Sequence, residues 1–157
     1  MARWRTCWIA SVGWLGRILN ESLLALVARL GIAAVFWQSG RTKVDGILTI
    51  RDSTYALFAE EFRVPLLAPE LAATLATWAE HLFPILLVLG LCTRLSALAL
   101  LTMTAVIQFF VYPDAWPTHL TWVAPLLWLL ARGAGAISLD RLVTLRTSPS
   151  KSSSTKS

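Results

Sequence analysis

Residues 71–91, LAATLATWAEHLFPILLVLGL, decide the fold of this chain. A helix of about 20 mostly apolar residues is long enough to cross the hydrocarbon layer of a membrane. Stretches of the same kind occupy 22–40, 95–112 and 120–139. The sequence therefore predicts an all-α integral membrane protein, a four-helix bundle embedded in a lipid bilayer.

The composition supports the same fold class. Of the 157 residues, 56% are hydrophobic and only 15% are charged, and the mean hydropathy is +0.63. Soluble domains have about a quarter of their residues charged. The net charge of +5 does not indicate nucleic-acid binding, because the basic residues flank the apolar stretches and form no basic patch.

The placement of Lys and Arg predicts the topology, because short loops rich in these residues stay on the cytoplasmic side of a membrane. Such residues precede the first span, separate the second span from the third and follow the fourth: Arg3, Arg5, Arg17, Arg94, Arg141, Arg146, Lys151 and Lys156. The first connection, 41–70, also carries cations and follows the rule imperfectly. We expect a multi-pass protein of the inner (cytoplasmic) membrane with both termini in the cytoplasm.

Three segments outside the spans have their own patterns. Residues 1–20 place tryptophans and apolar residues at helical spacing among arginines, which predicts an amphipathic segment lying in the headgroup region, with plain disorder as the alternative. The first connection is too apolar for a free loop, and we expect a short external helix over 54–62 that covers the mouth of the bundle. Residues 144–157 are rich in Ser, Thr and Lys and predict a disordered cytoplasmic tail. The membrane domain is thus expected to span 21–143.

Ionisable residues inside the spans are the candidate functional groups, because charges in lipid are costly and usually have a role. They are Arg29 in the first span and the pair Glu80 and His81 in the second. At 1.5 Å per residue, Arg29 lies about 13 Å along its helix and Glu80 about 15 Å along its own, from opposite sides. We therefore predict an ion pair between Arg29 and Glu80 near the middle of the membrane.

Two polar residues of the third span extend this site. Thr104 and Gln108 share a helix face at i, i+4, and we expect them to complete hydrogen bonds to Arg29, Glu80 or His81. The group as a whole is interpreted as a site for a ligand or for proton handling. The alternative is a buried polar network that only fixes the register of the helices.

No self-contained catalytic motif is visible, so enzymatic activity is left open. Cys7 and Cys92 are isolated, and neither His81 nor His119 has partners at a metal-binding spacing, so no metal site is predicted. The sequence also lacks a haem, flavin or iron–sulfur signature, and no intrinsic cofactor is expected.

Several motifs give the chain a resemblance to a known family. They are Arg29-x-Gly31, Phe36-x-x-x-Gly40-x-x-Lys43, Phe62-Arg63-Val64-Pro65, Glu80 with Pro84, the turn 90–94, Gln108-x-Phe110-Val111-Tyr112-Pro113 and Gly133-x-Gly135. In these motifs the chain resembles the DoxX family of small four-helix integral membrane proteins.

The resemblance implies a redox-linked role, since relatives include a membrane subunit of a thiosulfate:quinone oxidoreductase. It implies a quinone or a similar small apolar ligand at the polar site, and an oxidoreductase partner subunit. Two alternatives stay open from the residues themselves. One is a small-solute or ion carrier, which would need a homo-oligomer because no inverted repeat is evident. The other is a membrane anchor or scaffold for a partner protein.

Overall fold

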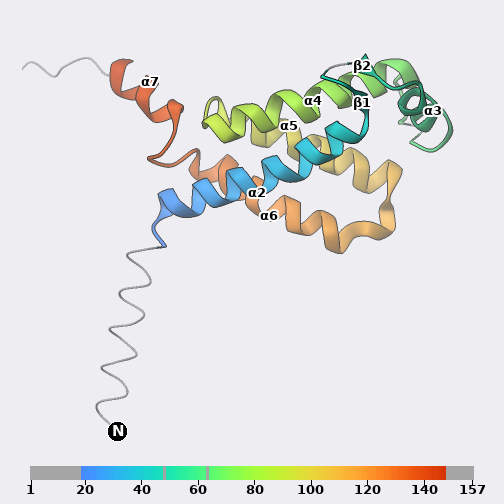
Figure 1. Ribbon diagram of the computed structural model, residues 1–157. Helices are drawn as coiled ribbons and strands as arrows, with labels where there is room; N and C mark the ends of the chain where they lie inside the picture. The colour runs from blue at the N-terminus through green and yellow to red at the C-terminus, as the bar shows by residue number, and fades with distance from the viewer. Residues whose placement is uncertain (1–18, 48, 63, 148–157) are drawn as a thin grey trace, which may run out of the picture.

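The structure, a computed structural model, describes residues 19–47, 49–62 and 64–147. Four long helices lie alongside one another in Figure 1: α2 (Glu21–Thr42), α4 (Pro69–Leu89), α5 (Thr93–Val106) and α6 (Trp116–Arg132). The shorter elements are β1 (Val44–Asp45), β2 (Thr49–Ile50), α3 (Asp52–Glu60), the π-helix η1 (Ile107–Val111), the 3-10 helix η2 (Pro113–Ala115) and α7 (Leu139–Thr147). The predicted all-α class is confirmed, with one small antiparallel pairing of β1 and β2 that the sequence did not predict.

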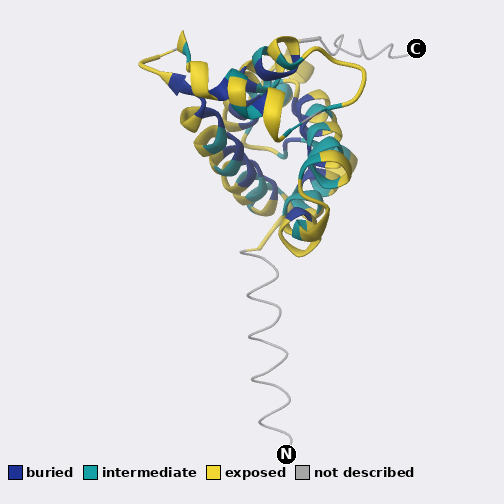
Figure 2. Ribbon diagram, turned by 90° about the vertical axis from the view of Figure 1, so that its right-hand side faces the viewer, coloured by how far each residue is buried: buried dark blue, intermediate teal, exposed yellow. Residues whose placement is uncertain are grey.

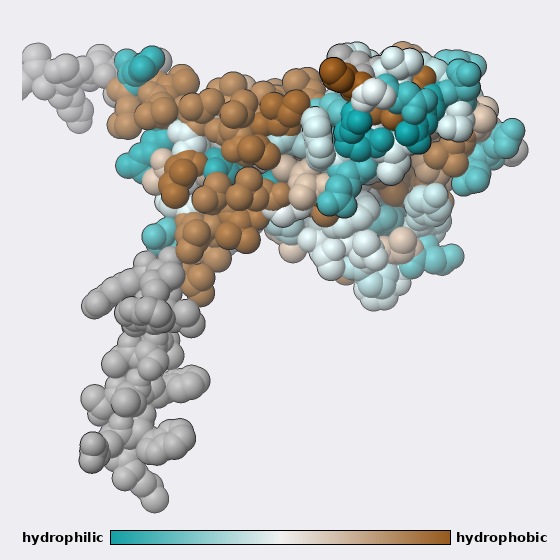
Figure 3. All heavy atoms as spheres, in the orientation of Figure 1, coloured by the Kyte–Doolittle hydropathy of each residue, from teal (hydrophilic) through white to brown (hydrophobic). Residues whose placement is uncertain are grey.

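In the part of the chain that the structure describes, three helical segments are long and apolar enough to cross a membrane: Glu21–Thr42, Pro69–Leu89 and Thr93–Val111. Their outer faces expose leucines such as Leu75, Leu82 and Leu98, each about half exposed. Figure 3 shows this apolar surface running along the helices, away from the end that carries α3. Such a surface suits lipid and not water. The chain is a multi-pass membrane protein.

The predicted fourth span, 120–139, is only partly correct. Helix α6 has 17 residues, begins at Trp116 and ends at Arg132. Gly133 and Gly135 follow with φ of 81° and 78°, a conformation that glycine adopts without strain and that ends the helix. The chain then turns into α7, so that the last residues of the predicted span lie outside α6.

The helices pack through side chains that face one another across the bundle. Figure 2 shows the buried positions on the inward surfaces of the helices. The core consists of Ala25, Ile32, Ala33, Phe36, Leu87, Ala97, Leu100, Leu126 and Leu129. Alanine at three of these nine positions lets neighbouring helix backbones approach closely, as is typical of membrane helices.

Local sequence signals set the helix ends. Asn20 caps α2 by accepting a hydrogen bond from the amide of Leu23 at 2.9 Å. Pro69 opens α4, where its missing N–H costs nothing. Gly90 ends α4 with φ of 65°, and the tight turn predicted at 90–94 is confirmed.

The first connection contains the predicted short helix. It is α3, which begins at Asp52 and ends at Glu60, two residues earlier at each end than the predicted 54–62. Phe58 of α3 packs against Ala72 and Ala73 of α4. The first turns of α4 therefore have α3 as their neighbour.

The two terminal segments are described only in part. Residues 144–147 of the predicted disordered tail are helical, because α7 continues to Thr147. Residues 148–157 and the interfacial helix predicted within 1–20, apart from Leu19 and Asn20, lie outside the described residues.

Candidate functional site

The register of α2 against α4 separates Arg29 from Glu80. A Cβ added to Gly40 of α2 would lie 2.9 Å from Cε1 of His81 and 3.1 Å from Cβ of Glu80. A Cβ added to Gly90, at the other end of α4, would overlap Nη1 of Arg29. Gly40 and Arg29 are about 16 Å apart along the helix axis at 1.5 Å per residue. The predicted ion pair between Arg29 and Glu80 is therefore wrong.

The error lies in the assumed depth of the helices. The predicted depths of Arg29 and Glu80 were counted in residues from the start of each helix, which assumes that α2 and α4 cover the same depth of the membrane. The first turns of α4 instead extend past the end of α2 and pack against α3, through Ala72 and Ala73. This offset brings Glu80 level with the last turn of α2, which contains Gly40.

Glu80 pairs with Lys43, the C-cap residue directly after α2. Nζ of Lys43 lies 2.7 Å from Oε2 of Glu80 and donates to Oε1 at 3.0 Å. The Ser39 hydroxyl donates to the same Oε1 at 3.0 Å and accepts from Nζ at 3.0 Å. The Lys43 and Glu80 side chains are only 10% and 4% exposed. The result is a closed triangle of charge-assisted hydrogen bonds.

The sequence interpretation missed Lys43 because a cation after an aromatic residue and a glycine is typical of a membrane exit. One signal could have found it. Ser39 and Lys43 are four residues apart and share a helix face. Two polar side chains one turn apart at the end of a span predict a polar or charged partner residue on the neighbouring helix.

His81 lies beside this triangle without joining it. Its Nδ1 lies 2.7 Å from the carbonyl oxygen of Thr77, which can only accept, so Nδ1 carries the proton. The ring packs edge-on against Trp37, with centroids 5.1 Å apart. Nε2 has no hydrogen-bond partner among the described residues. The imidazole ring of His81 is thus buried, and its acceptor Nε2 is not used by any described residue.

A cavity of about 370 Å³ opens next to the Lys43–Glu80 pair. Its polar wall includes Ser39, Lys43 and Glu80. The remaining walls are mostly apolar and come from α3, α4, α5, η1 and α6, with Phe58, Ala76, Met103, Val111 and Trp122 among them. The arrangement is an apolar chamber with a charged, hydrogen-bonded patch on one side.

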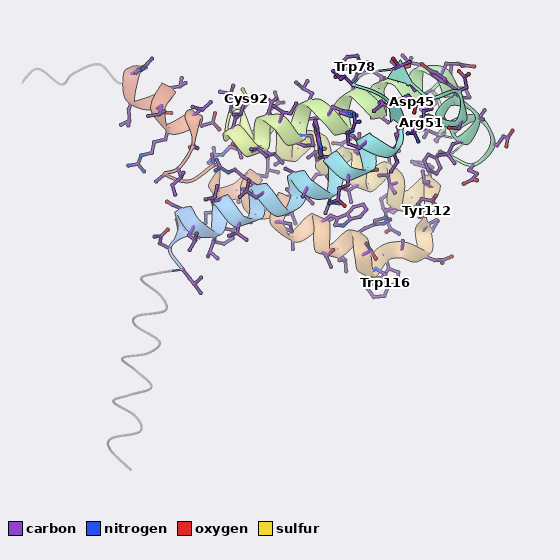
Figure 4. All side chains as sticks on the ribbon, in the orientation of Figure 1. Asp45, Arg51, Trp78, Cys92, Tyr112 and Trp116 are labelled. Carbon is purple, nitrogen blue, oxygen red and sulfur yellow. The ribbon has the colours of Figure 1, made fainter. Side chains whose placement is uncertain are left out.

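Aromatic residues indicate the depth of this chamber in the membrane. Trp78, Tyr112 and Trp116 are 46%, 48% and 59% exposed. Figure 4 shows all three toward the end of the bundle that carries α3. Exposed Trp and Tyr mark the boundary between lipid and water. Glu80 follows Trp78 by two residues, so the pair lies closer to this boundary than the predicted mid-membrane position.

In the described part of the chain, neither Thr104 nor Gln108 forms a hydrogen bond with Arg29, Glu80 or His81. The Thr104 hydroxyl donates to the carbonyl of Leu100 in its own helix at 2.8 Å. Gln108 donates to the carbonyl of Pro113 at 2.6 Å, and its Oε1 lies 2.6 Å from Nδ1 of His119. These contacts fix the turn between η1 and α6, so the hydrogen bonds predicted for Thr104 and Gln108 are replaced by local ones.

Arg29 belongs to a second polar cluster at the opposite end of the bundle. It is 1% exposed, and its Nη2 donates to the carbonyl of Ile137 at 2.7 Å. Nearby, the Asp140 carboxylate accepts from the amides of Cys92 and Thr93 at 2.8 and 3.0 Å. The amide of Asp140 donates to the carbonyl of Gly90 at 2.8 Å. Asp140 thereby caps α5 from a distant part of the chain, since Cys92 supplies no side-chain cap.

Within the described ranges, no group of three or more His, Cys, Asp or Glu side chains is placed to hold a metal ion. The chemistry available at the first cluster is therefore that of an ammonium, a carboxylate and a hydroxyl facing an apolar cavity.

Comparison with known proteins gives the family. Residues 24–113 match the sequence model of the DoxX family, which is more than half of the chain. The chain belongs to the DoxX family. The matched range of this DoxX protein includes the Lys43–Glu80 pair and Arg29 but ends before α6.

A full-length relative is also similar to this DoxX protein. It is an uncharacterized protein of Haemophilus influenzae, 31% identical over 144 residues that cover 85% of this chain and 91% of the relative. No solved structure matches the chain.

Proposed function

We propose that this DoxX protein is the membrane subunit of a redox-linked system and binds a quinone, or a similar flat apolar ligand, in the cavity beside Glu80. The observation that carries the proposal is the buried Lys43–Glu80 pair, which forms the polar wall of an otherwise apolar cavity. The proposal places the protein in the inner membrane with both termini in the cytoplasm.

The size and lining of the cavity favour such a ligand. Ligand sites have volumes of about 300–1,000 Å³ and combine apolar walls with a few placed polar groups. The volume here, about 370 Å³, lies at the lower end of that range and suits a single ring. Trp122 and Phe58 offer aromatic surfaces for a ring to pack against.

The polar wall supplies what a ring carbonyl needs. The longest hydrogen bond of the Lys43 ammonium goes to the carbonyl of Ser39, at 3.4 Å. A ligand oxygen can replace this weakest contact while the bonds to Glu80 remain. Glu80 is then the group nearest to a bound oxygen that can give or take a proton. Electrons would come from an oxidoreductase partner, since the chain carries no redox cofactor signature.

The test is a titration of the full-length protein, reconstituted in lipid nanodiscs, with a short-chain quinone, followed by calorimetry. We expect saturable binding. Lys43→Met should weaken it at least tenfold, since a hydrogen bond to a charged group contributes about 1.5 kcal/mol or more. Ala76→Phe, which places a ring inside the cavity, should abolish it.

The matched control is Arg51→Met. Arg51 pairs with Asp45 at 2.7 Å near the same end of the molecule, but both side chains are exposed and neither lines the cavity (Figure 4). Binding should be unchanged in this variant. Absence of saturable binding, or equal binding by the wild type and Lys43→Met, would refute the proposal.

A further inference from the structure

A second groove lies at the opposite end of the bundle, where α2 begins, α6 ends and α7 follows. Its volume is about 660 Å³. Arg94 of α5, Arg132 of α6 and Arg141 of α7 all line it. Three arginines from three separate helices thus line one groove at the surface of a membrane protein.

The acidic residues of this groove are already engaged. Glu21 pairs with Arg132 at 2.7 Å. The Asp140 carboxylate accepts the amides of Cys92 and Thr93. The three arginines that line the groove outnumber its two carboxylates by one, and buried Arg29 adds a further cation that bonds Ile137 in the segment before α7. The groove therefore keeps a net positive potential.

Arg94 has donors to spare for an anion. Its side chain donates from Nη2 to the carbonyl of Ala131 at a long 3.3 Å, and no other hydrogen bond of its side chain is seen within the described ranges. A guanidinium has five N–H donors in a flat fork that matches two oxygens of a phosphate. The groove side of α7 carries Arg141 and Thr144. These features favour a phosphate monoester or diester as the bound group.

Helix α7 indicates where that phosphate comes from. Its residues Leu142 and Leu145 are 55% and 64% exposed, and Ile137, just before it, is 58% exposed. Figure 3 shows this apolar surface continuing from the bundle onto α7, which projects from the end of the molecule in Figure 1. Leu145 also lines the groove, four residues after Arg141 on the same helix face, so exposed apolar side chains of α7 adjoin the cations of the groove. A helix that exposes both apolar and cationic side chains suits the headgroup layer of a membrane.

We propose that the groove lined by Arg94, Arg132 and Arg141 binds the phosphate of an anionic phospholipid, whose acyl chains lie along the exposed Leu142 and Leu145 of α7. Basic pockets between membrane helices bind anionic headgroups in this manner. The site is separate from the cavity at Glu80 and does not depend on its ligand.

The experiment measures thermal unfolding of the full-length protein in a neutral detergent, titrated in parallel with phosphatidylglycerol, phosphatidylcholine and inorganic phosphate. A ligand that binds only the folded protein raises Tm with its concentration. We expect phosphatidylglycerol to raise Tm saturably and the other two to have little effect. Arg94→Gln combined with Arg141→Gln should weaken the apparent affinity about 25-fold, at about fivefold per arginine near an anionic surface.

Two further variants keep the test decisive. Arg51→Gln removes an exposed arginine at the other end of the molecule and should respond like the wild type. Arg94→Lys with Arg141→Lys keeps the charge and should bind more weakly than the wild type but more tightly than the glutamine variant. If the glutamine variant fails to fold, the comparison of the lysine variant with the wild type still tests the groove. An equal response to phosphatidylcholine or inorganic phosphate, or an unaltered response in both double variants, would overturn the proposal.

Discussion

Nζ of Lys43 lies 2.7 Å from Oε2 of Glu80, and the two residues come from the end of α2 and the middle of α4. Both side chains are almost fully buried. Each charge is tolerated because the other is present, since an unpaired charge in a low-dielectric environment is costly. The pair therefore ties the last turn of α2 to α4 and sets the polarity of the cavity beside it.

Removing one member of this pair should be worse than removing both. We expect Lys43→Met or Glu80→Leu alone to lower the free energy of unfolding by about 3 kcal/mol, because each leaves an uncompensated buried charge. The double variant should recover much of that loss. Equilibrium unfolding in mixed micelles of the wild type and the three variants measures the coupling.

The exposed pair Arg51 and Asp45 provides the control cycle. Its side chains are 43% and 70% exposed, so its coupling should be within about 1 kcal/mol. A Lys43–Glu80 coupling no larger than this would contradict the buried pairing.

Arg29 should stabilise the turn after α6 and have no effect on Glu80. Its Nη2 holds the carbonyl of Ile137. Arg29→Met releases that carbonyl, so the neighbouring amides of Cys92, Thr93 and Asp140 should exchange hydrogen faster, because their bonds depend on the same segment. Hydrogen exchange followed by mass spectrometry measures this change.

Glu80→Gln serves as the comparison for Arg29. It should leave exchange at Cys92, Thr93 and Asp140 unaltered, since Glu80 lies in the middle of α4 and Arg29 lies beside Gly90 at the end of that helix. Faster exchange at those amides in Glu80→Gln would indicate that Glu80 interacts with Arg29, contrary to the structure.

Gly90 should tolerate no side chain, whereas Gly31 should accept one. At Gly90, φ is 65°, and a Cβ would overlap Nη1 of Arg29 and lie 2.6 Å from Cβ of Ser138. Gly90→Ala should therefore lower stability by about 1 kcal/mol from the backbone conformation alone, and by more from the clash. Gly31 has no atom within 4 Å of its Cβ position, and Gly31→Ala should raise stability by up to about 1 kcal/mol. Thermal unfolding of the two variants side by side measures the difference.

The sequence predicts the helices well because each carries its own signals. Apolar length, Pro69 at the start of α4 and Gly90 at its end are local features, and the structure has the helix between them. The end of α6 was placed too late because Ile137 and Leu139 continue the apolar pattern past Gly133. Helix existence is thus encoded locally, while a helix end can depend on the turn that follows.

The polar contacts were harder to predict because they depend on how far one helix slides along another. The residues Arg29 and Glu80 were correctly expected to be buried, but their partners, Ile137 and Lys43, follow from a register set by Gly40 against His81. Asp140 lies 48 residues from Cys92, and no local pattern connects an aspartate in one helix with the start of another. Sequence reasoning therefore found two of the buried charges without finding what each one contacts.

The topology can be tested through Cys92, which is exposed at the end of the bundle opposite Tyr112 and Trp116 (Figure 4). The proposed orientation puts this end in the cytoplasm. In a Cys7→Ser background, Cys92 should then resist a membrane-impermeant maleimide in intact spheroplasts and react after permeabilisation. Asp114, exposed in the turn between η1 and α6, gives the matched position at the other end. With Cys92 also replaced by serine, Asp114→Cys should react in intact spheroplasts, because the proposed orientation puts this turn outside. The reverse labelling pattern would show that the arginines flanking the spans do not set the orientation, and the protein would be inverted in the membrane.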